Sequence, residues 1–161
     1  MQSVEMDDLD RLIKRFDKTI QQYPSMKERA MKEAGEAMLS IVRHNVSASL
    51  ENDGGRVPGW QRPYQGTKHG YAAVRAVGGK EGGTGPESAG AITNYTENGH
   101  AIRRPAPVKR KGYRYRPRIH KPRVPGYHYY YYSDGPAQQA GAAAVAGLGD
   151  ELARELGGEN G

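Results

Sequence analysis

The sequence predicts an α+β fold in which N-terminal amphipathic helices and a C-terminal helix flank a small antiparallel β-sheet with a long basic arm. Apolar residues recur at helical spacing near both ends, short alternating segments occupy the middle, and a basic, proline-rich stretch interrupts them. A chain of 161 residues suits one domain. We expect a single domain over residues 1–161, divided into N-terminal helices at 4–50, a sheet at 71–133, its basic arm at 103–125 and a C-terminal helix at 136–157.

Two helices are predicted at the N-terminal end. A stripe of apolar side chains flanked by charged ones predicts an amphipathic helix over 4–22, and its members are Leu9, Leu12, Ile13, Phe16 and Ile20. Pro24 should end this helix. Ser25 followed by Glu28 is typical of a capping box, which would open a second helix that continues to about Ser49. The two helices are expected to pack as a hairpin.

The middle of the chain is predicted to hold loops and strands. Residues 52–70 show no apolar periodicity and contain five glycines, so we expect an exposed loop. Four segments are expected to form strands: 71–77, 91–96, 113–119 and 127–132. The glycine-rich residues 78–90 should join the first two strands as a flexible hairpin loop. Because proline cannot donate a ladder hydrogen bond, most of residues 105–125 must form an extended arm or an edge hairpin.

The last predicted element is a helix in the Ala-rich C-terminal stretch. Its apolar residues recur at spacings of three and four, and they are Val145, Leu148, Leu152 and Leu156. Three interior glycines should weaken this helix, which we expect over about 136–156.

Large apolar residues are scarce in this chain. Leu, Ile, Val and Phe fill 23 of the 161 positions, which is below the ~20% at which a chain usually builds its own core. The two ends can fold because their apolar residues are clustered, but the middle would need a partner surface to offset the entropy of ordering it. We therefore expect an oligomer or a component of a larger assembly.

Residues 98–133 carry most of the positive charge. They contain ten Lys and Arg residues, seven of the eleven tyrosines and no acid, so their charge is +10 in a chain of net charge +6. Such a stretch attracts polyanions, of which nucleic acid is the commonest, although a solvated loop or a subunit contact would have the same composition. The basic residues are Arg103, Arg104, Lys109, Arg110, Lys111, Arg114, Arg116, Arg118, Lys121 and Arg123.

Within this arm, alternation places Arg114, Arg116 and Arg118 on one face of an extended segment. That face could follow phosphates without reading the base sequence. It could equally clasp an acidic protein.

Aromatic residues mark a possible subunit interface. Tyr127, Tyr129, Tyr130, Tyr131 and Tyr132 form a run that is aromatic on both faces of a strand, which suits either a contact between subunits or a plain core strand. Trp60, in the 52–70 loop, would be either a further interface anchor or a loop cap.

No group of residues points to catalysis. The chain has no cysteine, and its histidines, at 44, 69, 100, 120 and 128, show no metal-ligand spacing. The glycine clusters lack the ending of a phosphate-binding loop. We expect no enzyme activity, catalytic residue, metal or cofactor. The acidic N-terminus differs from a signal peptide and no stretch approaches a membrane span, so we expect a soluble, intracellular protein without a membrane partner.

Two short motifs and the order of the parts resemble a known family. The first motif comprises Asn94, Glu97, Gly99 and His100, and the second comprises Pro125, Gly126, His128 and Tyr129. The chain is similar in these respects to the head-tail joining, or tail-completion, neck proteins of long-tailed double-stranded DNA bacteriophages.

The resemblance implies a structural virion protein without catalysis, metal or cofactor. Its subunits would form a homo-oligomeric ring in the neck, between the DNA-filled head and the tail, after assembly in the host cytoplasm. Neighbouring neck, portal-side and tail-tube proteins would be its partners, and packaged double-stranded DNA would pass through the lumen without being read. The alternative is a non-catalytic nucleic-acid-binding protein that grips RNA or DNA with its basic Tyr/Arg-rich arm.

Overall fold

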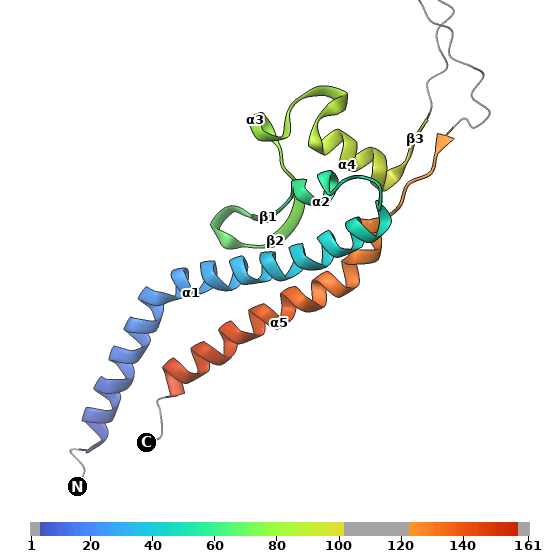
Figure 1. Ribbon diagram of the computed structural model, residues 1–161. Coiled ribbons are helices and arrows are strands. Elements are labelled where there is room, and N and C mark those ends of the chain that lie inside the picture. The colour runs from blue at the N-terminus through green and yellow to red at the C-terminus, as the bar shows by residue number, and fades with distance from the viewer. Residues whose placement is uncertain (1–3, 102–122, 158–161) are drawn as a thin grey trace, which may run out of the picture.

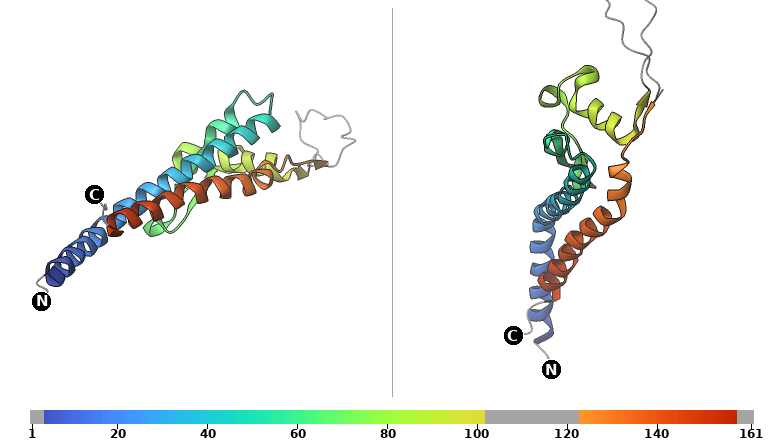
Figure 2. Two further views of the ribbon diagram at one scale, coloured as in Figure 1. Left: turned by 90° about the horizontal axis from the view of Figure 1, so that it is seen from below. Right: turned by 45° about the vertical axis from the view of Figure 1, so that its right-hand side comes forward.

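Two long helices form the frame of the molecule. The computed structural model describes residues 4–101 and 123–157. Helix α1 (Val4–Ser49) and helix α5 (Tyr129–Gly157) run side by side in opposite directions, and a β-hairpin and a shorter helix pack near the far end of α1 (Figures 1 and 2). The described part is mostly helical with small antiparallel sheets, which confirms the predicted α+β class.

The prediction of two N-terminal helices joined by a turn is wrong, because α1 continues through Pro24. Proline removes one helical hydrogen bond and bends a helix, and α1 changes direction between its dark-blue first part and its lighter remainder (Figure 1). The Ser25 hydroxyl does not open a new helix; it donates to the Gln22 carbonyl at 2.8 Å.

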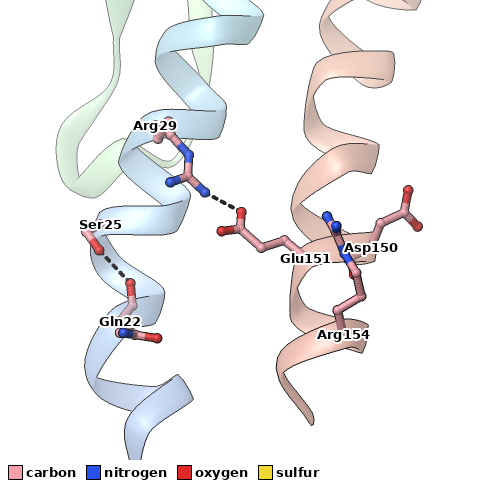
Figure 3. A network of polar contacts seen from close by, with 6 residues as sticks. All are labelled: Gln22, Ser25, Arg29, Asp150, Glu151 and Arg154. Atoms are coloured by element: carbon pink, nitrogen blue, oxygen red, sulfur yellow. Dashed lines mark hydrogen bonds and ion pairs between the residues drawn. The ribbon is translucent and has the colours of Figure 1, made fainter. Parts of the chain in front are cut away.

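Packing against α5 accounts for the continuity of α1. Lys18, before the proline, pairs with Glu155 at 3.2 Å, and Arg29, after it, pairs with Glu151 (Figure 3). This pairing with Glu151 also raises the pKa of Arg29 above its usual value. Because α5 holds α1 on both sides of Pro24, the missing hydrogen bond does not separate the two halves.

The hairpin lies where an exposed loop was predicted. Helix α2 (Arg56–Trp60) leads into β1 (Gln61–Gln65), which pairs antiparallel with β2 (Ala72–Ala76) so that Gln61 faces Ala76; a 3-10 turn, η1 (Thr67–His69), lies between the strands. The loop prediction for 52–70 is therefore wrong, whereas the strand at 71–77 is confirmed. Periodicity missed β1 because its sequence is polar and contains a proline.

A helix also replaces the strand predicted at 91–96. Helix α4 (Ala89–Asn98) follows two short turns, α3 (Gly79–Gly82) and η2 (Gly85–Glu87), so residues 78–90 are not a loop between two strands. Ser88 caps α4 by accepting a hydrogen bond from the Ala91 amide at 3.2 Å. Its buried residues are Ala89, Thr93 and Glu97. Their spacing of four is helical, and short alternation in 91–96 concealed it.

The tyrosine run is helical too. The strand predicted at 127–132 is wrong, because α5 begins at Tyr129 and continues through Pro136 to Gly157. The C-terminal helix is thereby confirmed with an earlier start. Strands β3 (His100–Ala101) and β4 (Arg123–Val124) pair antiparallel at the two ends of the basic arm. The predicted strand at 113–119 lies outside the described residues.

A small hydrophobic cluster lies where the hairpin meets the two long helices, and further buried apolar residues follow α1 from Met26 to Leu39. Its fully packed members are Val42, Val46, Val57 and Tyr129. Partly buried residues surround them, and these are Leu50, Trp60, Val74, Ile92 and Tyr130. Tyr129, the largest of the four fully packed members, belongs to the tyrosine run.

Candidate functional site at the root of the basic arm

The end of α4 and the start of α5 are joined by hydrogen bonds. The amides of Tyr127 and His128 donate to the carbonyls of Thr96 and Glu97, at 2.9 and 3.1 Å. The Glu97 carboxylate then accepts from the amides of Tyr130 at 3.0 Å and Tyr131 at 3.4 Å. A carboxylate at this position satisfies amides that have no partner within the helix and complements the positive end of its dipole. Glu97 is thus the N-terminal cap of α5.

Two glycines let the chain segments touch. A Cβ atom on Gly126 would lie 2.1 Å from the Glu97 carbonyl oxygen, and one on Gly99 would lie 2.4 Å from the Val124 carbonyl oxygen. Gly99 also has a φ of 71°, which glycine adopts most readily. Arg123 completes the junction by donating to the Asn98 carbonyl at 3.1 Å. The root of the basic arm is therefore held by backbone contacts.

The two motifs noticed in the sequence meet at this junction. Glu97 and Gly99, from the first, contact backbone atoms of the segment that contains Gly126 and His128, from the second. Asn94 accepts a hydrogen bond from the Asn98 side chain at 2.8 Å, within α4. These contacts give the motif residues Glu97, Gly99 and Gly126 a structural role, which is to position the arm relative to the helices.

Tyr129 anchors the junction in the core. It is 0% exposed, its hydroxyl donates to the Thr93 carbonyl at 2.8 Å and lies 2.8 Å from the Thr96 hydroxyl. Burial raises the pKa of Tyr129 to about 12, partly opposed by the hydrogen bond with Thr96. Assigning Tyr129 to a subunit interface is corrected here, because a buried side chain cannot contact a neighbouring subunit.

Tyr130 leads to a buried polar residue that sequence reasoning missed. Its hydroxyl donates to the Gln61 side-chain oxygen, and burial raises its pKa. Gln61 is fully buried. Its side-chain nitrogen donates to the Val57 carbonyl at 3.0 Å, and its backbone carbonyl accepts from the Arg43 guanidinium at 2.9 Å. Nothing in the local sequence distinguishes this glutamine from an exposed one.

The other aromatic candidates fall into two groups. Tyr127, Tyr131 and Tyr132 are exposed beside the junction, with Tyr131 at 76% and Tyr132 at 65%. The last two rings contact each other at 5.5 Å between centroids. Trp60 instead packs against the core, with the Arg56 guanidinium 5.2 Å from its ring. We call Tyr127, Tyr131 and Tyr132 the tyrosine surface.

Of the ten basic residues of the arm, the structure describes only Arg123, which is exposed in β4. The other candidates lie outside the described residues: Arg103, Arg104, Lys109, Arg110, Lys111, Arg114, Arg116, Arg118 and Lys121. The structure therefore places the root of the arm, and the charge of the arm is known from the sequence.

The polar groups at the junction hold the end of α4 against the start of α5. An open cavity of about 340 Å³ lies beside it, lined by parts of β2 and α4 and by Tyr130. Glu97 reaches this cavity, but its carboxylate is engaged by two amides. Within residues 4–101 and 123–157, no three His, Asp or Glu side chains gather closely enough to hold a metal. None of the helices described has the length and apolar character needed to cross a membrane.

Comparison with known proteins finds no match among family models, curated proteins or solved structures.

Alkaline pH is expected to weaken the fold through Tyr129. An unfolded tyrosine loses its proton near pH 10, whereas the pKa of Tyr129 is about 12 in the fold. Its contribution is complete below pH 10 and is lost as the pH rises towards 12, by about 3 kcal/mol in the free energy of unfolding. Urea unfolding at several pH values measures this decline, which Tyr129→Phe should make shallower. The exposed control Tyr131→Phe should leave it unchanged, and equal slopes for all three proteins would contradict the assignment.

Proposed function

We propose that this protein is a structural subunit of a bacteriophage neck, which forms a ring between the DNA-filled head and the tail and is assembled in the host cytoplasm. The observation that carries the proposal is the clasped root of the basic arm beside the tyrosine surface. Such a root gives the positively charged arm the same starting point in every copy, which a symmetric ring requires.

The tyrosine surface supports assembly with other subunits. Exposed aromatic side chains beside one another are typical of interfaces, where the rings are buried and the hydroxyls find polar partners. Tyr127, Tyr131 and Tyr132 lie close in sequence to Tyr129, which the core holds rigidly. A neighbouring subunit that covers them would do so without rearranging the fold.

The charge of the arm supports a setting near phosphate. Residues 98–133 carry +10 and the remainder of the chain sums to −4, since the whole is +6. An arm in the lumen of a ring would meet packaged DNA through sequence-independent phosphate contacts. An arm on the outside would meet acidic surfaces of portal-side or tail-tube proteins instead. The resemblance of the two motifs to neck proteins agrees with both arrangements.

The size and the DNA binding of the purified protein test this proposal. We expect light scattering to give a ring-sized oligomer and a salt series to give weak DNA binding. A monomer with tight, steeply salt-dependent binding would favour a free nucleic-acid-binding protein, the alternative function.

Neutralising the arm should separate its role from folding. The variant combines three substitutions, Arg114→Gln, Arg116→Gln and Arg118→Gln. We expect its DNA affinity at low salt to be at least tenfold lower than that of the parent protein. The salt dependence of binding should also become shallower, because fewer counterions are released from the DNA phosphates. Circular dichroism should show unchanged helix content. A matched control removes the same charge from exposed positions elsewhere, at Lys32, Lys80 and Arg154. A control that weakens binding as much would show that net charge, and not the arm, attracts DNA.

A further inference from the structure

The first part of α1 exposes a continuous apolar stripe. Six large apolar side chains, each 40–68% exposed, follow one another at helical spacing: Leu9, Leu12, Ile13, Phe16, Ile20 and Tyr23. Exposed apolar surface of this extent marks a contact with another molecule. We call these six residues the α1 stripe.

Helix α5 covers the α1 stripe only at one end. Leu156, near the end of α5, lines an apolar cavity of about 220 Å³ together with Phe16, Ile20 and Tyr23. Helix α5 ends at Gly157, and α1 continues past it, as the dark-blue turns in Figures 1 and 2 show. Because Lys18 pairs with Glu155, two residues before the end of α5, the earlier residues Leu9, Leu12 and Ile13 extend beyond the helix that packs against the rest of α1.

The basic arm is attached to the fold far from the stripe. Its ends are held together by β3 and β4 beside the start of α5, at the opposite end of the helix pair (Figure 1).

Charge along the same helix indicates what does cover the stripe. Four acids and no base lie within residues 5–10, a charge of −4, whereas residues 11–18 carry +3, from the bases Arg11, Lys14, Arg15 and Lys18 and the acid Asp17. When two copies of this helix lie antiparallel, the acidic part of each faces the basic part of the other. A parallel pair would instead place like charges together, which is destabilising.

We propose that the α1 stripe binds the same stripe of a second copy in an antiparallel, two-fold symmetric pair. Each overhanging helix then lies along its partner's α1 and directs apolar side chains towards the cavity beside Leu156. Such a self-complementary contact closes at two copies. It lies at the other end of α5 from the tyrosine surface, so the inference does not depend on the proposed function.

Spin labels on the full chain test both the contact and its direction. The chain has no cysteine, so Gln21→Cys provides a single attachment point on an exposed position next to the stripe. In an antiparallel pair that sets residues 5–10 of one copy against residues 11–18 of the other, the centre lies near residue 11, and two labels at this position are about 30 Å apart along the axis, because the helix rises 1.5 Å per residue. Pulsed electron paramagnetic resonance at about 100 µM protein should record a distance of this order. A distance near 10 Å would show a parallel pair and overturn the proposal.

Variants of the stripe identify its role. Leu9→Ser with Ile13→Ser should weaken the pair at least tenfold, with unchanged circular dichroism because both side chains are half exposed. Lys14→Glu with Arg15→Glu leaves the apolar stripe intact and should weaken the pair as well. The control, Tyr131→Ser with Tyr132→Ser, should keep the distance because it changes the other end of the molecule.

Two outcomes would assign the stripe to another partner or to none. Labelled protein that shows no distance between copies at 100 µM overturns the proposal. If that protein also floats with vesicles of anionic lipid, the stripe binds a lipid surface.

Discussion

Gly126→Ala is expected to lower the free energy of unfolding by about 3 kcal/mol and to release the root of the basic arm. The added methyl group would lie 2.1 Å from the Glu97 carbonyl oxygen and 2.6 Å from the Asn98 carbonyl carbon. Both are backbone atoms of α4, so no side-chain rotation can make room. The α4 end would have to move away from α5, which would break the hydrogen bonds of Glu97 to the amides of Tyr130 and Tyr131.

Urea unfolding followed by circular dichroism measures this loss, and Gly147→Ala is the matched control. A Cβ atom on Gly147, inside α5, meets no atom within 4 Å. Alanine favours a helix interior over glycine, so the control should be stabilised by about 0.5 to 1 kcal/mol. A Gly126→Ala protein as stable as the parent would show that α4 and α5 are not in close backbone contact.

Tyr129→Ala is expected to cost about 3 to 5 kcal/mol, the usual range for removing a buried aromatic ring. The ring packs with Val42, Val46 and Val57, so its loss opens a cavity among them. It also removes the hydrogen bond that the phenol donates to the Thr93 carbonyl, which leaves the Thr96 hydroxyl as a donor to that oxygen. In a chain with so few large apolar residues, this loss is a considerable part of the total stability.

A neighbouring exposed tyrosine provides the control for the loss of a buried one. Tyr131→Ala changes the same residue type two positions later, where the side chain is 76% exposed, and should alter stability by no more than about 0.5 kcal/mol. Chemical unfolding of both variants provides the comparison. Equal losses would mean that the tyrosine run stabilises the subunit as a whole, whereas the structure assigns Tyr129 to the core and Tyr131 to the surface.

The N-terminal helices show where apolar spacing was a sufficient guide and where it was not. The stripe through Leu9, Phe16 and Ile20 correctly predicted helix, since the spacing of apolar residues is a local property. Pro24 wrongly predicted an interruption. Its local cost is offset by the packing of α1 against α5, whose residues opposite Lys18 and Arg29 lie more than a hundred positions away in sequence. The predicted hairpin of two N-terminal helices would have buried this stripe, whereas in the structure the stripe is exposed.

The middle of the chain was harder to predict because its local preferences are weak. The alternation in 91–96 and the aromatic run at 127–132 both suggested strands. In the structure each lies in a helix, and Glu97 joins the two by capping α5 from the end of α4. Helix capping between segments about 30 residues apart leaves no periodic signal. The glycines at 99 and 126 stood out within short motifs, but only their contact explains why each is glycine.

Sequence by itself determined the α+β class, the helical ends, the strand at 71–77, the separation of charge between the arm and the rest, and the scarcity of core residues. These properties follow from composition and from short-range periodicity. Tertiary structure alone decided that α1 passes through Pro24, that Gln61 and Tyr129 are buried while Tyr131 is exposed, and that two distant motifs clasp the arm. The physical reason is that each depends on a partner far along the chain, whose packing outweighs the local preference of the segment.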